Sequence, residues 1–198
     1  MVVIEQADEE KFNRGKLLNI GALWCCSHFR DTANVQICLH DVDTVPAPML
    51  VPFYCHGRPG ECVHLGWINR KYDYPTFFGG VCAMSLSDFL LAGGFPNHFW
   101  GWGREDDVLH SRLCCLARCR VLIPDAEAGM SFIGDAAGGP TRAESDNHIT
   151  MAHILGQDNI FDIPEFCVAS TQELAEQATS ICVMLHGKRC EYNDLMET

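Results

Sequence analysis

Segments with the residue pattern of β-strands alternate along this chain with segments that have the pattern of α-helices. We expect a strand over 2–6, a helix over 9–24 and a second strand over 35–40, where apolar residues fall at every second position. Together these three segments would form a βαβ unit. Such an alternation predicts an α/β sandwich with a mixed, mostly parallel sheet flanked by helices.

The rest of the chain continues the alternation. The region 51–74 is rich in Gly, Pro, Cys and His, and we expect it to be irregular apart from one short strand over 62–65. Capping patterns predict two further helices, one opened by Ser85 with Asp88 and ended by a glycine pair, the other a short one opened by Ser170 with Glu173. The remaining expected elements are strands over 77–85, 119–124 and 180–187, a helix over 105–118 and a loop over 135–147.

The size and charge of the chain exclude some classes of protein. Its 198 residues, of which 47% are hydrophobic, are enough to bury the core of a single domain spanning 1–198. The formal net charge of -12 and the absence of a Lys/Arg cluster argue against a nucleic-acid partner. No apolar run reaches about 18 residues and the start of the chain lacks a basic segment, so the sequence predicts neither a membrane segment nor a signal peptide in this chain.

The chain contains 12 cysteines but no CxxC motif. Cys114, Cys115 and Cys119 follow His110 closely enough to suggest a zinc site on one helix. Small apolar cysteines on a helix face are more commonly part of the core, and we favour that interpretation. The cysteine content leaves the redox compartment open.

Two stretches of the sequence carry acids in positions suited to chemistry. In "HDVDTVP", Asp41 and Asp43 follow an apolar strand, at the carboxyl end where α/β sheets bind ligands. Their oxygen atoms would suit Mg²⁺ or Mn²⁺, although acids at strand ends are also common on surfaces.

The second stretch is "FWGWGREDDVLHSRL", in which three acids, Glu105, Asp106 and Asp107, open the expected helix. The helix dipole there would keep carboxylates ionised, and an ionised carboxylate can act as a base. Trp100 and Trp102 would offer apolar platforms for a sugar ring. Alternatively, the acids only cap the helix and the tryptophans only fill the core, but the glycines around Trp102 favour a bent, mobile loop close to a ligand.

Several segments together resemble one known family. In order and approximate spacing, "FNRGKLLNIG", "HDVDTVP", "FFGGVCAMS" and "GGFPNHFWGWGREDD" are similar to the beta-1,4-galactosyltransferases, which are metal-dependent inverting glycosyltransferases. "GREDD", "YDYPTFFGG" and the C-terminal "CVAS" and "ICVML" look most like the xylosylprotein branch, which adds galactose to xylose. The resemblance covers most of residues 2–185 and implies a GT-A fold, a UDP-sugar donor and Mn²⁺ as cofactor.

The resemblance also implies a role for each matched residue. On the donor side, the matched positions are Phe12 and Arg14 for the uridine nucleotide, Asp41, Val42 and Asp43 for the donor with Asp43 as the metal ligand, and Gly79 and Gly80 for the sugar. On the acceptor side, they are Glu105 and Asp106, with Asp106 as the catalytic base, and Tyr72 and Tyr74 around the xylose pocket. Trp102 matches the tryptophan that covers both substrates.

The chain departs from the family pattern at three points. Phe77 replaces a tyrosine that helps to read the donor sugar. The segment 130–139 contains no histidine where the family supplies a second metal ligand, which leaves Asp135, His148 and His153 as candidates. The chain also begins at what resembles the family's second strand, so we expect a catalytic domain that lacks the first strand and is N-terminally incomplete.

Two functions of different class follow from this resemblance. The first is a metal-dependent enzyme that moves galactose from UDP-galactose to xylose or another saccharide on a glycoprotein or proteoglycan, in the Golgi lumen. The second is an inactive, truncated relative that binds a saccharide or a protein. A redox or zinc protein built on the cysteines is a third, less favoured alternative.

Overall fold

The computed structural model describes residues 1–46, 48–55, 57–66, 77–124, 130–132, 145–163, 166–175 and 178–185. The strands are β1 (Val2–Gln6), β2 (Gln36–His40), β3 (Thr44–Pro46), β4 (Glu61–His64), β5 (Val81–Ser85), β6 (Arg120–Leu122), β7 (Met130–Phe132), β8 (Cys167–Ala175) and β9 (Ala178–Met184). The α-helices are α1 (Arg14–His28), α2 (Val51–Tyr54), α3 (Leu86–Ala92), α4 (Glu105–Cys115) and α5 (Met151–Ile154). Short 3-10 helices lie at Thr32–Asn34, Pro48–Leu50 and Ile160–Asp162.

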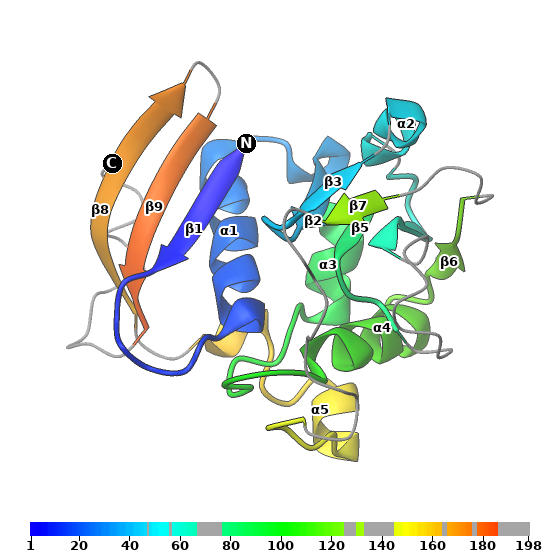
Figure 1. Cartoon of the computed structure of the whole chain (residues 1–198). Helices are drawn as coiled ribbons and strands as arrows, with labels where there is room; N and C mark the ends of the chain where they lie inside the picture. The colour runs from blue at the N-terminus through cyan, green and yellow to red at the C-terminus, as the bar shows by residue number, and fades with distance from the viewer. Residues whose placement is uncertain are drawn as a thin grey trace.

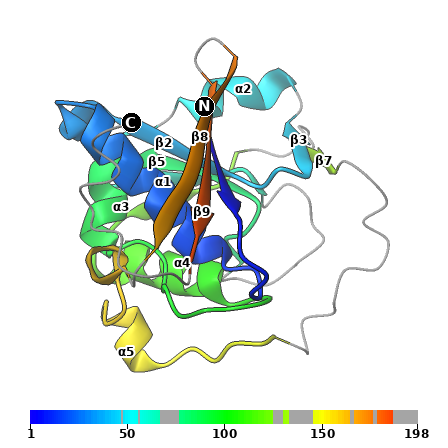
Figure 2. The same ribbon diagram turned by 90° about the vertical axis from the view of Figure 1, so that its left-hand side faces the viewer.

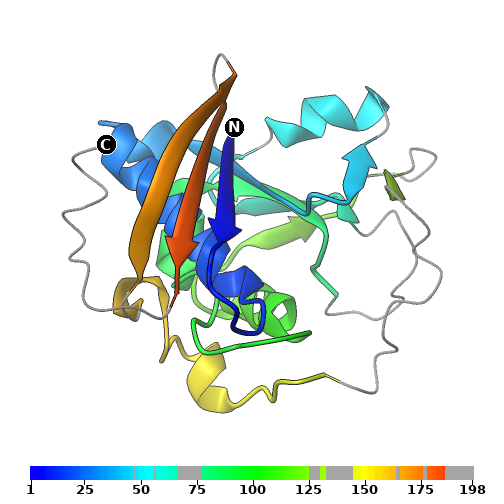
Figure 3. The ribbon, with the colours of Figure 1, turned by 60° about the vertical axis from the view of Figure 1, so that its left-hand side comes forward.

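The described strands form three separate sheets. One sheet has the order β1-β9-β8, the second has the order β2-β5-β4-β6, and β3 pairs with β7 alone. Figure 3 shows the three-stranded sheet in front, with β1 beside β9. The βαβ expectation is therefore wrong, because β1 and β2 lie in different sheets on either side of α1 (Figure 1).

The α/β class with mixed sheets flanked by helices is confirmed, but the expectation of mostly parallel strands is wrong. In the described part of the chain, β1–β9 and β4–β6 run parallel, whereas β2 and β4 both pair antiparallel with β5. The pairs β3–β7 and β8–β9 are also antiparallel. The alternation of helices and strands along a sequence determines neither which strands pair nor whether a pair is parallel. Here β5 runs opposite to both of its neighbours, β2 and β4, so both pairs are antiparallel.

Helix α1 packs between the two larger sheets. On one face, Leu17 and Ile20 pack against Ile181 and Val183 of β9. On the other face, Ala22 joins the core that contains the buried residues of β2, β5, α3 and α4. The helix begins at Arg14, later than expected, because the Asn13 side chain accepts a hydrogen bond from the Lys16 N–H and caps it.

The four-stranded sheet is covered on both faces. Successive residues of β4 point to opposite sides, so Cys62 joins the core under α3 and α4, while Val63 packs with Leu50 and Phe53 beneath α2. Both sides of this sheet are therefore dry, and a ligand can reach it only at the strand ends.

Local capping signals succeed at one of the two predicted helices. Ser85 caps α3 by accepting from the Asp88 N–H, and the helix ends at Gly93 with a φ of 81°. The helix expected from Ser170 and Glu173 is wrong, since both residues lie in β8 and pair with β9. The ladder with β9 satisfies the backbone groups that a helix would otherwise use. The strands expected near 62–65, 77–85, 119–124 and 180–187 are present as β4, β5, β6 and β9. Among the described residues, no helix has the length and apolar character needed to cross a bilayer.

Candidate active site

A largely buried arginine, Arg14, marks the place where four chain segments meet. The Nε of Arg14, at the start of α1, donates to Asp41 Oδ1 at 2.7 Å, just beyond the end of β2. Its Nη1 lies 3.5 Å from Glu105 Oε1 at the start of α4. The guanidinium sits 5.7 Å from the centre of the Phe95 ring. Three residues that sequence analysis assigned separately, Arg14, Asp41 and Glu105, are thus joined by ion pairs.

The next acid of α4 lies against the glycine pair that precedes β5. A Cβ on Gly79 would lie 2.7 Å from Asp106 Oδ2, so only a glycine lets this carboxylate approach the backbone. The neighbouring Gly80 carbonyl accepts from the Asp41 N–H at 3.2 Å. The predicted donor glycines, the predicted base and the Asp41 position therefore share one small volume.

Burial changes the proton affinity of these acids. Burial and the nearby Glu105 charge raise the pKa of Asp106 to about 7, while Arg14 opposes that rise. Burial also raises the pKa of Glu105, and again Arg14 opposes it. The expectation that the helix dipole keeps these acids fully ionised is wrong for Asp106, because desolvation outweighs the dipole. Burial would lower the pKa of Arg14, but the carboxylates of Asp41, Glu105 and Asp106 raise it overall.

The third acid, Asp107, is held differently. Its backbone N–H donates to Asp106 Oδ1 at 2.9 Å and so fixes the neighbouring carboxylate. Its own side chain is buried, with Oδ2 3.5 Å from Arg104 Nη1 and with no hydrogen-bond partner for Oδ1 among the described residues. Asp107 therefore supports Asp106 and does not itself face the glycine pair.

The loop that leads into α4 is bent and pinned at both sides. Gly101 has a φ of 79°, and a Cβ there would overlap with Asp146 Oδ2. Asp146 accepts from the Trp102 N–H at 2.9 Å and donates its own N–H to the Trp102 carbonyl at 3.0 Å. The Gly101 N–H donates to the Phe12 carbonyl at 2.9 Å. The bend predicted from the glycines is thus present, and it brings the backbone of Gly101, next to Trp102, against that of the exposed Phe12.

The two tryptophans of this loop do different things. Trp100 packs on the cluster formed by α1 and β9, and Lys16 Nζ lies 5.9 Å from its ring centre. Trp102 is half-buried and follows Gly101 in the bent loop that leads into α4. Trp100 is therefore part of the core and does not form a sugar platform. For Trp102 the platform stays a prediction.

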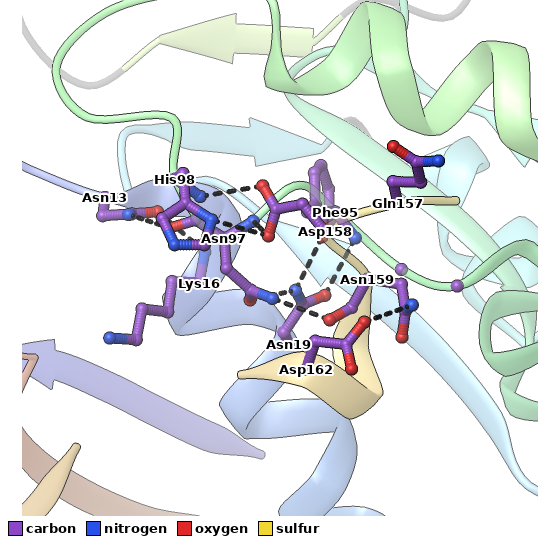
Figure 4. A network of polar contacts seen from close by, with 12 residues as sticks. Asn13, Lys16, Asn19, Phe95, Asn97, His98, Gln157, Asp158, Asn159 and Asp162 are labelled. Carbon is purple, nitrogen blue, oxygen red and sulfur yellow. Dashed lines mark hydrogen bonds and ion pairs between the residues drawn. The ribbon is translucent and has the colours of Figure 1, made fainter. Parts of the chain in front are cut away.

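A network of buried amides fixes α1 against the turn before this loop (Figure 4). Asn19 accepts from the Phe95 N–H and donates to the Phe95 carbonyl, both at 2.9 Å. Asn13 donates to the Asn97 carbonyl at 2.7 Å, and the Asn97 side chain reaches Asn159. The side-chain amides of Asn13, Asn19 and Asn97 all have hydrogen-bond partners. These bonds fix the position of the start of α1 relative to the segment that leads into α4.

The predicted metal position offers oxygen at the surface. Asp43 is exposed and makes no hydrogen bond or ion pair with the described residues, and Val42 beside it is 86% exposed. A carboxylate of this kind fits Mn²⁺, whereas Asp41 is already engaged by Arg14. No three potential ligands come together within the described segments.

The candidate second ligands are only partly visible in the structure. His153 belongs to α5, which lies at the end of the molecule opposite β3 in both views (Figures 1 and 2). Its ring takes part in the cap of α5 and packs edge-on against Phe99. We therefore withdraw His153 as a partner of Asp43. His148 forms no such group with Asp43 in the described part of the chain. Asp135, Tyr72 and Tyr74 lie outside the described residues.

The cysteines form no zinc cluster among the described residues. Cys114 Sγ lies 3.9 Å from His110 Nε2, while Cys119 is buried and its thiol points to the Ala117 carbonyl. Cys167 at the start of β8 is disulfide-bonded.

Two residues near the site were missed by sequence analysis. His64 is buried in β4, and its Nε2 lies 2.9 Å from the carbonyl oxygen of Gly79. Asp146 pins Trp102 from a segment far along the chain. Neither carries a local sequence signal, because each acts on a partner that only the fold brings near.

The overall fold is similar to that of solved structures. The structure is similar to the catalytic domain of Drosophila beta1,4galactosyltransferase 7 in complex with xylobiose, with a TM-score of 0.71, 22% identity, and coverage of 98% of this chain and 82% of that chain. A mutant of the Drosophila enzyme in complex with manganese, UDP-Gal and xylobiose gives a TM-score of 0.70 at 22% identity, with the same coverage. The fold is the GT-A fold of nucleotide-sugar transferases.

Sequence comparison finds similar proteins of one family. Residues 63–132 match a family model described as the N-terminal domain of galactosyltransferase. Mouse beta-1,4-galactosyltransferase 2 is 37% identical over 128 residues, which are 64% of this chain and 34% of the mouse protein. Human beta-1,4-galactosyltransferase 4 is 39% identical over 136 residues, 64% of this chain and 36% of the human protein. The chain is similar to the beta-1,4-galactosyltransferases over 64% of its own length and spans about a third of the length of the curated relatives it matches.

Proposed function

We propose that this chain forms a single catalytic domain that transfers galactose from UDP-galactose to a saccharide acceptor, with inversion at the anomeric carbon. The observation that carries the proposal is the contact between Asp106 and Gly79, beside the Arg14–Asp41 ion pair. One direct displacement requires the base and the donor-side residues to lie close together, and this contact supports the proposal.

The residues would divide the chemistry as follows. Asp106 takes the proton from the acceptor hydroxyl, and a pKa of about 7 suits a base that works near neutral pH. Glu105 accepts hydrogen bonds from the acceptor, and Trp102 packs on the sugar ring. Phe12, Arg14 and Gly80 line the donor side.

Asp43 is the residue that would hold Mn²⁺ through a carboxylate oxygen. When bound, the metal offsets the charge that builds on the departing diphosphate. The solved Drosophila complex with manganese, UDP-Gal and xylobiose supports this assignment by similarity of fold.

We propose xylose as the preferred acceptor and a glycoprotein or proteoglycan as its carrier. The proposal rests on the resemblance of the GREDD segment and on the xylobiose complex of the Drosophila enzyme. On the donor side, the Phe77 ring would lie 2.8 Å from a Cβ on Gly79, so a phenyl edge without a hydroxyl borders the sugar position. Discrimination between UDP-galactose and an N-acetylated donor would therefore depend on shape more than on a hydrogen bond.

We also propose that the protein works in the Golgi lumen. The disulfide at Cys167 supports an oxidising compartment of this kind.

The test is a transfer assay with UDP-galactose, Mn²⁺ and a β-xyloside. We expect transfer by the wild-type chain, a loss of at least about 100-fold in Asp106→Asn, and little change in Asp162→Asn, where the acid is exposed on a 3-10 helix. Chelation with EDTA and the change Asp43→Ala are each expected to abolish transfer. Added Mn²⁺ should restore transfer to the EDTA-treated wild type but not to Asp43→Ala. Equal transfer by Asp106→Asn and the wild type would refute the assigned base.

A second candidate function is supported by the metal site, where no three ligands gather among the described residues. In that case the chain binds a saccharide without transferring galactose. Xyloside binding by calorimetry, with no turnover of UDP-galactose at any Mn²⁺ concentration, would select this alternative.

A further inference from the structure

Arg14 contacts both halves of the site at once. Its side chain is only 17% exposed, and it bridges Asp41 beyond β2 to Glu105 at the start of α4. Nη1 makes the longer of the two contacts, 3.5 Å, and has no hydrogen-bond partner among the described residues. The single positive charge of the guanidinium therefore interacts with two carboxylates from separate parts of the chain.

The surroundings leave Arg14 little freedom to move away from these acids. A Cβ on Gly15 would lie 2.9 Å from Phe95 Cβ, so α1 packs directly on the turn that leads to α4. The Phe95 ring lies beneath the guanidinium, and Asn13 and Asn19 bind the same turn by hydrogen bonds. The position of Arg14 relative to α4 is therefore set by packing on both sides.

We propose that Arg14 is a positioning residue that ties the acid beyond β2 to the acids that open α4, so that the donor side and the acceptor side share one buried cation. The inference rests on the proposed function, and it goes beyond a role in holding the nucleotide. Its consequence is that the geometry and charge of Glu105 and Asp106 depend on a residue of the donor side.

Charge balance shows what the arginine does for the base. Asp106 is faced by Arg14 from α1, by Glu105 and Asp107 from its own helix, and by the backbone of Gly79. Arg14 is the cation among these groups, and it lowers the pKa of Asp106 against burial and the two negative charges. Removing Arg14 would raise that pKa further, and a smaller fraction of Asp106 would be ionised at neutral pH.

The first test is the pH profile of kcat/KM for a β-xyloside at saturating UDP-galactose and Mn²⁺. Arg14→Gln is expected to move the acidic limb upward by about one pH unit. Arg14→Lys keeps the charge and is expected to restore the limb in large part. The control is Arg120→Gln, which removes an exposed arginine that pairs with Glu61 on the far edge of the sheet, and its profile should match the wild type.

A different result would identify a nucleotide-binding role alone. If Arg14→Gln raises only the KM for UDP-galactose and leaves the acidic limb in place, the proposal is overturned. The same conclusion follows if Arg14→Lys and Arg14→Gln shift the limb equally.

The second test needs no activity, so it separates this inference from the proposed function. Urea unfolding at pH 8 is compared for Arg14→Gln, Glu105→Gln and the double variant. We expect Arg14→Gln to lower the urea midpoint clearly in the wild-type background and much less in the Glu105→Gln background. Strictly additive midpoint changes would show that the two side chains are not coupled. If Arg14 and Glu105 are coupled but the protein has no transferase activity, the inference about Arg14 stands and only the proposed function is refuted.

Discussion

At the scale of single residues, the site holds acids that the fold does not stabilise. Asp106 is 9% exposed and lies beside Glu105 and Asp107 at the first turn of α4. Three acids in succession at a buried helix start repel each other, and Arg14 compensates for only part of the charge. Residues arranged in this way cost stability and are typical of functional sites.

This cost can be measured through the pH dependence of stability. The pKa of Asp106 is raised to about 7 from an ordinary value of 3.8, so the folded state binds this proton more tightly than the unfolded state does. The contribution of Asp106 is therefore most favourable below about pH 4 and is lost as the pH rises through 7. We expect Asp106→Asn to stabilise the fold at pH 8 by about 4 kcal/mol and to lose this advantage at pH 4, measured by urea unfolding. An advantage that is the same at both pH values would contradict the raised pKa.

His64 predicts the opposite slope. Burial lowers its pKa to about 4 from 6.5, so the ring is neutral in the folded protein and its Nε2 donates to the Gly79 carbonyl. The unfolded state takes up the proton first, and stability is lost as the pH falls from 6.5 to 4.

In His64→Gln, which keeps a donor, we expect the pH-dependent loss over this window to shrink by about 3 kcal/mol. Thermal unfolding between pH 4 and 7 measures it. Parallel curves for the variant and the wild type would show that His64 does not titrate in this window.

The sequence predicts some of these residues and not others. Asp41, Asp43, Glu105 and Asp106 could be found because the end of a strand and the start of a helix are local features that expose side chains to a ligand. The joining of Arg14 to Glu105 depends on how α1 packs against the turn at Phe95, which no local pattern encodes. Their assigned roles stay predictions until the assays are done.

At the scale of elements, buried amides decide where α1 lies. Asn13, Asn19 and Asn97 are all 0% exposed, and each bonds to backbone groups outside its own element. Buried polar groups of this kind are costly when unpaired, so the network permits one relative position of α1 and the turn 95–98.

Removing one member of the network is expected to be severe. Asn19→Ala leaves the Phe95 N–H and carbonyl without partners in a dry environment, and we expect a loss of about 3 kcal/mol in urea unfolding. The matched control is Asn34→Ala, whose side chain is exposed and bonds to Asp31, and which should cost less than about 1 kcal/mol. Equal losses in the two variants would mean that the network does not hold α1.

Elements were predictable where their cause is local. The helix over Leu86–Ala92 follows from Ser85 and the glycines after it, because both caps act within a few residues. The same type of cap at Ser170 failed because pairing with β9 satisfies more backbone groups than a short helix would. The start of α1 was placed too early because the sequence does not show that Asn13 is the capping residue.

At the scale of the whole molecule, one arginine joins distant parts of the chain. Arg112 of α4 is fully buried and donates to the carbonyls of Gly93, Gly94, His153, Gln157 and Asp158. It thereby fastens the end of α3 and the segment from α5 to the last 3-10 helix onto α4. A planar group with five donors is suited to this, and a lysine is not.

Arg112→Lys is accordingly expected to loosen this region. We predict a loss of about 3 kcal/mol in global stability and faster amide hydrogen exchange over 153–159 than in the wild type. The matched control is Arg118→Lys at an exposed position, which should leave both measurements nearly unchanged. Unchanged exchange in Arg112→Lys would show that the carbonyls find other partners.

The assembly of the sheets was the least predictable level. Six strands lie where the sequence predicts them, whereas β3, β7 and β8 are not predicted. The pairing of β1 with β9 joins the two ends of the described chain, and nothing in either strand identifies its partner. The prediction of the α/β class is confirmed because it depends only on which kinds of element are present. The predicted βαβ unit is wrong because it requires β1 and β2 to lie in one sheet, and they lie in different sheets.

The position of α1 between the two larger sheets has a consequence for how the molecule responds to change. The two sheets pack against opposite faces of α1, so unfolding of either sheet would expose a face of the helix on which the other sheet also depends. Within the described residues, we therefore expect the two larger sheets to unfold together. We therefore expect a change of packing on the β9 side of α1 to alter the position of Arg14 and, with it, the acids that Arg14 contacts.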